Sequence, residues 1–303
     1  MFARILAATD FSASSDAALA EARRLAHSLD ASLHVLHVVD NMFMRAVLAD
    51  PRDYETAALR QLQDRVPADA DATLAIGRSD EPADEITSYA RVHNIELIVM
   101  GTHGRGRMAH LLLGSVAERV ARTAPCPVLT MRAAAPATSG VGPRILVPTD
   151  FSACSDAALG CAKRLAAGVG GSVRLLHVME HSAVSAGLGS EMVPEPPEVA
   201  AERAATAKVE LARRMIVDSR SRVKIAGDVV YGPVGATIAN YARDNGFGVI
   251  VMGTHGRRGI AHLLMGSVAE SMIRTAPCPV LTVKAPHADQ VRQAEAEPAS
   301  IAV

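Results

Sequence analysis

Two stretches of this chain are nearly the same sequence. The first, MGTHGRGRMAHLLLGSVAERVARTAPCPVLT, runs from Met100 to Thr130, and the second, MGTHGRRGIAHLLMGSVAESMIRTAPCPVLT, runs from Met252 to Thr282. They align without a gap and are identical at 24 of 31 positions. A repeat of this length predicts two copies of one folding unit within the chain.

The beginnings of the two copies repeat as well. Arg4 to Ala26 and Arg144 to Ala166 are identical at 17 of 23 positions. The offset between the copies is 140 residues here and 152 at the glycine-rich stretches, so the second copy holds 12 extra residues in between. In a chain of 303 residues, this predicts domains at 1–132 and 144–284. The small, uncharged, Pro/Gly-containing segment 133–143 reads as a flexible linker, and 285–303 as a mobile tail.

Composition excludes several classes of protein. The net charge is −1, tryptophan is absent and only 3% of residues are aromatic, which argues against a nucleic-acid-binding surface. No apolar run approaches transmembrane length, and Asp10 comes too early for a signal peptide. Four cysteines without a CxxC motif fit a reducing compartment. We therefore expect a cytoplasmic protein with no nucleic-acid or membrane partner.

Short apolar strands alternate with helical patterns in both copies. In the first copy, we predict strands at Ile5 to Ala8, Ser32 to Val39, Ala72 to Ile76, Glu96 to Met100 and Pro127 to Met131. The second copy follows the same order, with strands near Ile145, Val173, Val229, Val249 and Val280. This alternation predicts an α/β fold with a five-stranded parallel sheet in each domain. Among several strand orders, the doubly wound order 3-2-1-4-5 places a ligand crevice between strands one and four.

Each glycine-rich stretch connects the fourth strand to a helix. The glycines stand at one spacing, Gly101, Gly104 and Gly114 in the first copy, and Gly253, Gly256 and Gly266 in the second. Glycine takes positive φ and allows a ligand to approach the backbone. The serine that follows, Ser115 or Ser267, stands at a helix N-terminus, where free N–H groups favour an anion. Arg105 and Arg107, or Arg257 and Arg258, carry charges that could close over a polyphosphate.

Local structure offers an alternative explanation for these residues. Ser115 with Glu118, and Ser267 with Glu270, match the capping-box pattern and could simply begin a helix. The histidines of the glycine loops, His103 and His255, are read as hydrogen-bonding residues rather than metal ligands.

The first strand of each copy ends in the sequence TDFS. Asp10 and Asp150 face the predicted crevice and could bind a nucleoside. The alternative is a local turn, in which each carboxylate bonds the nearby serine, Ser12 or Ser152.

The spacing G-x2-G-x9-G-[ST], met in full by both copies, resembles the nucleotide-binding pattern of the universal stress proteins, specifically their tandem form. The resemblance also covers TDFS, the LHV of the second strand and the closing PCPVL. It implies Rossmann-like domains that bind ATP, with Mg²⁺ accompanying the nucleotide. The backbones of Val38 and Val178 would hold the adenine edge, and Asp10 and Asp150 the nucleoside. The remaining implied contacts are Met100, Gly101, Gly104, Arg105, Gly114, Ser115, Val116, Met252, Gly253, Gly256, Arg257, Gly266, Ser267 and Val268.

The resemblance also implies contacts between domains. The family pairs domains through the fifth strand, so we expect the two halves to pair with each other and the chain to form a homodimer through this strand. The first copy departs from the common pattern, with Ala8 where the second copy has Pro148.

Three functions remain open at this point. The first is an ATP-binding stress-response or signalling protein whose nucleotide state regulates its protein partners. The second is a slow ATPase or a nucleotide-handling enzyme of the related Rossmann-like superfamily. The third is a scaffold that has lost its nucleotide. No carboxylate stands in the glycine loops to act as a base, which favours binding over turnover, and the intact glycine spacing argues against the scaffold.

Overall fold

The computed structural model describes residues 2–40, 51–67, 71–102, 114–132, 142–180, 183–185, 192–216, 223–256 and 265–285. The predicted linker and tail lie almost wholly outside these ranges. Below, the first half means residues 1–132 and the second half residues 144–284.

Each half alternates strands and helices, as predicted. The elements of the first half are β1 (Arg4–Thr9), α1 (Ala13–Leu29), β2 (Ser32–Asp40), α3 (Pro51–Arg65), β3 (Ala72–Ser79), α4 (Pro82–Val92), β4 (Leu97–Gly101), α5 (Ser115–Thr123) and β5 (Val128–Met131). Those of the second half are β6 (Arg144–Pro148), α6 (Ala153–Val169), β7 (Ser172–Met179), β8 (Ala183–Ser185), β9 (Met192–Pro194), α7 (Pro197–Met215), β10 (Lys224–Tyr231), α8 (Val234–Asp244), β11 (Val249–Gly253), α9 (Ser267–Thr275) and β12 (Val280–Val283).

The strand order confirms the predicted topology in both halves. The strands of the first half lie in the order β3-β2-β1-β4-β5, and those of the second half in the order β10-β7-β6-β11-β12. All pairings within these two sets are parallel. From β1 the chain passes through α1 to β2, towards one edge of the sheet. From β4 it passes through α5 to β5, towards the other edge. β1 and β4 are therefore neighbours at the centre of the five strands. The carboxyl ends of β1 and β4 therefore form the switch point of the sheet.

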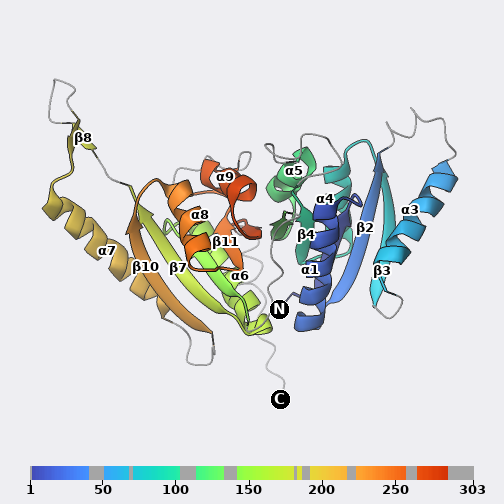
Figure 1. Ribbon diagram of the computed structural model, residues 1–303, viewed down its shortest axis with the longest axis horizontal. Helices are drawn as coiled ribbons and strands as arrows, with labels where there is room; N and C mark the ends of the chain where they lie inside the picture. Colours follow the sequence, from blue (N-terminus) through green and yellow to red (C-terminus); the bar gives the residue numbers. More distant parts are fainter. Residues whose placement is uncertain are drawn as a thin grey trace, which may run out of the picture.

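The two halves join into one ten-stranded sheet, so the predicted pairing of the fifth strands is confirmed (Figure 1). β5 and β12 are antiparallel, with Leu129 opposite Leu281. Two threonines reinforce the junction, because Thr130 Oγ1 donates to the carbonyl of Val280 over 3.1 Å and Thr282 Oγ1 to that of Val128 over 3.2 Å. This junction occupies the outer edge of each fifth strand.

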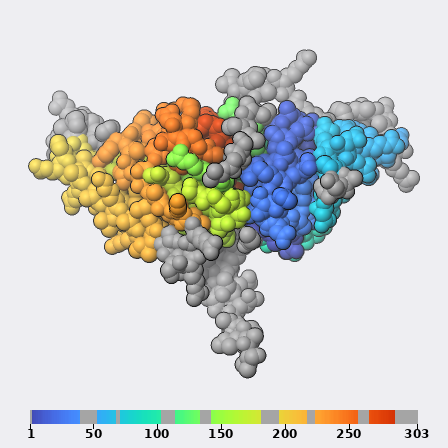
Figure 2. All heavy atoms as spheres, turned by 60° about the horizontal axis from the view of Figure 1, so that its bottom comes forward, coloured from blue at the N-terminus to red at the C-terminus, as the bar shows by residue number. Residues whose placement is uncertain are grey.

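Alternate strand residues supply the cores on opposite faces of the sheet. In β1, Ile5 and Ala7 belong to one buried cluster, whereas Leu6 and Ala8 belong to another, as the two-residue period of a strand requires. The first of these clusters includes residues of α1 and α6 and runs across both halves. Figure 2 shows the blue surface of α1 against the yellow-green surface of the second half.

The four cysteines are all free. Within the part of the chain that the structure describes, no helix combines the length and apolar character needed to cross a membrane. The extra residues of the second half form, in part, the small antiparallel pair β8–β9, which the sequence analysis does not predict.

Candidate functional site

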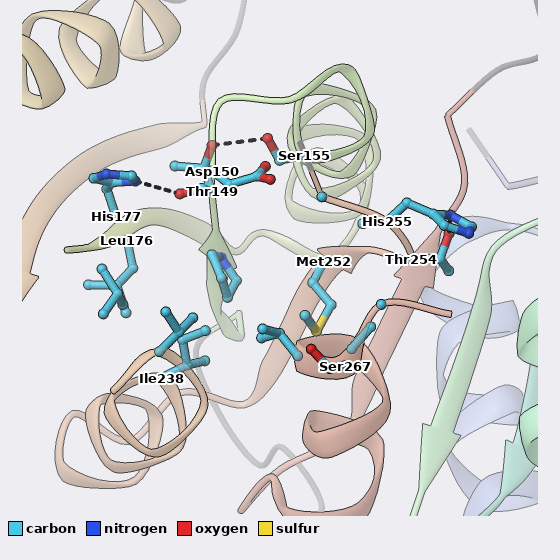
Figure 3. Close-up of a pocket in the computed structure, with 18 residues that line it drawn as sticks. Thr149, Asp150, Ser155, Leu176, His177, Ile238, Met252, Thr254, His255 and Ser267 are labelled. Carbon is cyan, nitrogen blue, oxygen red and sulfur yellow. Dashed lines mark hydrogen bonds between the residues drawn. The ribbon is translucent and has the colours of Figure 1, made fainter. Parts of the chain in front are cut away.

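Each half contains a cavity at the carboxyl ends of its first and fourth strands. The cavity of the second half has a volume of about 460 Å³ and that of the first half about 240 Å³. Residues from the β6–α6 turn, β7, α8, β11 and the start of α9 line the larger cavity (Figure 3). The crevice predicted from the topology is therefore a real hollow in both halves.

The predicted site residues of the first half gather at this cavity. Its lining includes Asp10, Val38, Met100, Gly101, Gly114, Ser115 and Val116. Gly104, Arg105 and His103 lie outside the described residues.

The second half repeats the arrangement. Its lining includes Asp150, Val178, Met252, Gly253, Gly256, Gly266, Ser267 and Val268. Arg257 lies outside the described residues.

The aspartate after the first strand of each half makes a local turn and also borders the cavity. Ser12 donates to Asp10 Oδ1 through its backbone N–H (3.1 Å) and through its hydroxyl (2.6 Å). Asp150 and Ser152 repeat both bonds at the same distances. A Cβ placed on Gly256 would lie 2.7 Å from Asp150 Oδ2, so the second carboxylate oxygen reaches the loop across the cavity. The turn bonds thus fix an orientation that leaves the carboxylate at the site.

The glycine before the site helix, rather than the serine, is its N-cap. Gly114 has φ −60° and ψ 130°, and its N–H donates to the carbonyl of Thr102 over 2.8 Å. Ser115 is consequently the first helical residue, is exposed and makes no cap bond. Gly266 and Ser267 repeat this geometry. The capping-box alternative is therefore wrong for both helices, because the bond to the strand end places the cap one residue earlier.

The described glycines of the loops do not use the positive φ that glycine allows. None of Gly101, Gly114, Gly253, Gly256 and Gly266 is among the positive-φ glycines of the described residues. A different constraint applies at the end of the fourth strand. A Cβ on Gly101 would lie 2.5 Å from Ser14 Oγ and 2.9 Å from the Ser14 carbonyl carbon. Glycine at this position lets the N-terminus of α1 pack directly against the strand.

Several lining residues were not predicted, although most of them recur in both halves. Thr9 and Ser15 share a hydrogen bond of 3.0 Å, and Thr149 and Ser155 one of 3.1 Å. Their repetition at an offset of 140 residues was a usable signal. The resemblance also implies the strand-end residues Thr102, Thr254 and His255, which line the cavities. The remaining unpredicted contacts form the cavity floor and its rim, which are Ala8, Leu36, Pro82, Ile86 and Ala117 in the first half and Pro148, Leu176, His177, Val234, Ile238 and Ala269 in the second.

Two histidines of the second site have hydrogen-bonded rings. His177 Nδ1 donates to the carbonyl of Thr149 over 2.7 Å. His255 Nδ1 shares a 2.9 Å hydrogen bond with Thr254 Oγ1. Among the described residues, no group of three or more potential metal ligands occurs.

The electrostatic character of each site comes mainly from the backbone. The described lining contains one carboxylate per half and no lysine or arginine. The N-termini of α5 and α9 border the cavities, and their first-turn N–H groups carry partial positive charge. Cys126 and Cys278 lie at the other end of the sheet, just before β5 and β12, and burial raises the pKa of both thiols to about 12. The arrangement can therefore hold an anion next to an apolar ring, with a hydrogen-bond acceptor on the opposite side.

Comparison with known proteins assigns both halves to one family. The model of the universal stress protein family matches residues 1–132 and 143–284.

Individual relatives agree with this match. A universal stress protein of Mycolicibacterium smegmatis is 25% identical over 293 residues, which cover 92% of this chain and 96% of the relative. A universal stress protein of Thermus aquaticus is 36% identical over 140 residues, covering 44% of this chain and 100% of the relative. The second relative thus corresponds in length to a single half.

Solved structures share the fold of the complete chain. A protein of unknown function from Pseudomonas aeruginosa PAO1 has a TM-score of 0.65 at 17% identity, with 98% of each chain covered. A universal stress protein of Archaeoglobus fulgidus has a TM-score of 0.62 at 22% identity, with 94% of this chain and 97% of that chain covered. At such identities the likeness concerns the fold alone.

Proposed function

Because the chain belongs to the universal stress protein family, with one such domain in each half, we propose that it binds ATP, one molecule per half. Its nucleotide state would then regulate its interactions with other proteins. The observation that carries this proposal is the convergence, in both halves, of an aspartate, an apolar floor and a helix N-terminus on one cavity. Members of this family often bind nucleotides.

The lining of the second-half cavity offers suitable contacts to the base, the ribose and the phosphates of a nucleotide. Leu176, Val178 and Ile238 supply apolar contacts for a base. Asp150 offers a carboxylate to a ribose hydroxyl or a base N–H, and the first turn of α9 offers N–H groups to phosphate oxygens. The larger cavity falls within the range of about 300–1,000 Å³ that is usual for small-molecule sites. The first-half cavity is smaller, so we propose that the second half binds the nucleotide more tightly.

Mg²⁺ fits the proposal as a companion of the phosphates. Magnesium is usually held by one or two carboxylates, several waters and the phosphates of the nucleotide itself. A dedicated protein cage is therefore not required, and the described residues contain none.

The described lining supports binding of ATP without rapid hydrolysis. Hydrolysis needs a group that positions the attacking water near the terminal phosphate. The described carboxylate of each site is engaged by its own turn serine through Oδ1. A slow ATPase remains the alternative, and phosphate release measured alongside binding separates the two.

Assembly with a second chain is part of the same proposal. A homodimer through strand five has no open strand edge to use, because β5 and β12 each have neighbours on both sides. The free strand edges of the described sheet belong to β3 and β10. A homodimer would therefore form through these edges or through helix faces.

Titration calorimetry with ATP and Mg²⁺ tests the assignment of the sites. Wild-type protein should bind two ATP, and Gly266→Val should remove one of them. Valine fits the backbone at φ −63°, but its Cβ would lie 3.2 Å from the carbonyl of Thr254 at the cavity wall. Gly114→Val should remove the other site.

A matched control guards against a general effect of losing a glycine. Gly160 lies in α6, and apart from the neighbouring helix backbone the nearest described atom to a new Cβ is Arg164 Nη1, 4.0 Å away. Gly160→Ala should keep both sites. Unchanged stoichiometry in both valine variants would refute the assignment.

A further inference from the structure

A strained phenylalanine follows the site aspartate in each half. Phe11 has φ 63° and Phe151 has φ 65°, which is the left-handed region that bulky side chains avoid. Such a conformation persists only where its surroundings hold it in place. Because Asp10 and Asp150 directly precede these residues, whatever holds the phenylalanine also sets the direction of the carboxylate.

Each phenylalanine ring lies between a histidine and an arginine. The Phe11 and His37 ring centroids are 4.3 Å apart, and Arg65 Cζ lies 4.9 Å from the Phe11 centroid. The His37 side chain is further tied to the same turn, because Nδ1 donates to the carbonyl of Thr9 over 2.8 Å. The strained turn is thus held by β2 through the histidine and by α3 through the arginine.

The second half builds the same sandwich. The ring centroids of Phe151 and His177 are 4.4 Å apart, and Arg214 Cζ lies 4.9 Å from the Phe151 centroid. Arg214 also donates to the carbonyl of Phe151 over 3.3 Å.

Ion pairs fix each arginine above its ring. Arg65 Nε donates to Asp16 Oδ1 over 2.9 Å, and Arg214 Nε to Asp156 Oδ1 over 2.6 Å. Both aspartates lie in the first turn of the helix that begins at the strained turn. The side chain of Arg214 is 19% exposed and that of Asp156 is 46% exposed, so the arginine is better shielded from water than the carboxylate with which it pairs.

The two arginines come from the least similar parts of the halves. Their positions differ by 149 residues, which matches neither of the two offsets of the repeat. The helices that carry them, α3 and α7, are the outermost helices of the molecule (Figure 1). α3 and α7 differ in sequence, yet each places an arginine over the phenylalanine of the turn that follows the first strand of its own half.

We propose that Arg65 and Arg214 are positioning residues, each of which clamps the strained turn and so orients the aspartate at the nucleoside end of its site. The docking of an outer helix, α3 or α7, is thereby coupled to the binding of the nucleoside. The ligand in this statement rests on the proposed function, whereas the clamp on the turn can be measured without a ligand.

The clamp touches one end of the site only. It acts on the β1–α1 or β6–α6 turn, while the first turns of α5 and α9 form the phosphate end. Loss of the arginine should therefore weaken ligands that carry a nucleoside and leave inorganic tripolyphosphate unaffected. A merely structural role would weaken both or neither.

The test uses the full chain with Arg65→Met and Arg214→Met, singly and together. Without ligand, amide hydrogen exchange in the turns around Phe11 and Phe151 should become about tenfold faster, as expected for losing a partly shielded cation–π contact and its ion pair. Adenosine affinity should fall by a similar factor, with tripolyphosphate affinity unchanged.

Two other arginines provide matched controls. Arg78 of β3 pairs with Glu55 of α3, and Arg203 of α7 pairs with Glu195 over 2.6 Å. Arg78→Met and Arg203→Met remove ion pairs that involve these helices and leave the ring sandwiches in place, so neither exchange nor affinity should change.

Unchanged exchange at the turns in both clamp variants would overturn the proposal. An equal loss of affinity for adenosine and tripolyphosphate would overturn it as well. If wild-type protein binds neither ligand, the proposed function fails, and the exchange rates alone decide whether the clamp exists.

Discussion

At the scale of single residues, the glycines of the repeated stretch serve packing as much as ligand access. Gly101 and Gly253 let helix N-termini approach the fourth strand, where a Cβ would lie 2.5 Å from Ser14 Oγ or 2.9 Å from Cys154 Sγ. Gly114 and Gly266 cap the site helices in an extended conformation. The spacing of the glycines thus reflects the junction of strand, helix and cavity.

Gly101→Ala should destabilise the protein by about 1–3 kcal/mol, the usual cost of overpacking. The new Cβ meets backbone atoms of α1, which cannot move without shifting the helix. Gly160→Ala is the matched control, since alanine within a helix is more stable than glycine by about 0.5–1 kcal/mol. Denaturant unfolding measures both changes, and an unchanged midpoint for Gly101→Ala would contradict the packing role.

The same residues show how far sequence reasoning reaches. The repeats and the apolar pattern predict alternating strands and helices in two parallel sheets and leave several strand orders open, of which the doubly wound order 3-2-1-4-5 is the one observed. They also predict the residues at the switch point. The cap at Gly114 could not be predicted, because the pattern Ser-x-x-Glu does not reveal that the Gly114 N–H bonds to Thr102. The arginine clamp was missed because Arg65 and Arg214 stand outside the repeated segments.

At the scale of elements, one lysine links the two halves through a site helix. Lys284 Nζ donates to the carbonyl of Ala124 over 2.8 Å, and Ala124 is the C-cap of α5. The preceding residue, Val283, accepts the N–H of Thr254 over 2.9 Å. Through these two bonds, the segment Val283–Lys284 joins the end of α5 to the glycine loop of the second half.

Stability should depend on Lys284 at alkaline pH. Burial is the main reason that its pKa is lowered from 10.5 to about 8, with Cys126 opposing and Arg91 adding to the effect. Between these values the unfolded chain binds more protons than the folded one, so the free energy of unfolding rises as pH increases from about 8 to 10.5. Below about pH 8 the lysine is charged in both states, and the cost of burying that charge is fully present.

The comparison with Lys284→Met isolates this effect. The unfolding free energy of wild-type protein, relative to that of the variant, should increase between about pH 8 and pH 10.5. Lys208→Met, an exposed position on α7, provides the control and should leave the pH dependence of wild-type stability unchanged. Parallel curves for wild type and Lys284→Met would contradict the assignment.

At the scale of the whole molecule, the two halves share one core. A single buried cluster contains residues of α1 and β5 together with residues of α6 and β12. Leu25, Leu129 and Leu165 also border one small cavity of about 20 Å³ between the halves. Since the β5–β12 ladder and this core cross the same boundary, we expect the halves to unfold together.

Leu165→Ala should therefore affect both halves. Its side chain is 5% exposed within the shared cluster, and truncating a buried leucine usually costs about 2–5 kcal/mol. Hydrogen exchange measured across a denaturant series should show the same loss in peptides from 1–132 and from 144–284. A loss restricted to the second half would show that the halves unfold independently.

The central claim is that each half holds one adenine nucleotide. The most direct test is to denature the protein immediately after purification, and to identify and quantify the released small molecules by chromatography and mass spectrometry, with binding of added ATP titrated in parallel. The account predicts ATP or its product ADP among the released molecules and saturation at two nucleotides per chain, with the second half filling first. Protein that releases no nucleotide and gives no binding signal with added ATP would contradict it.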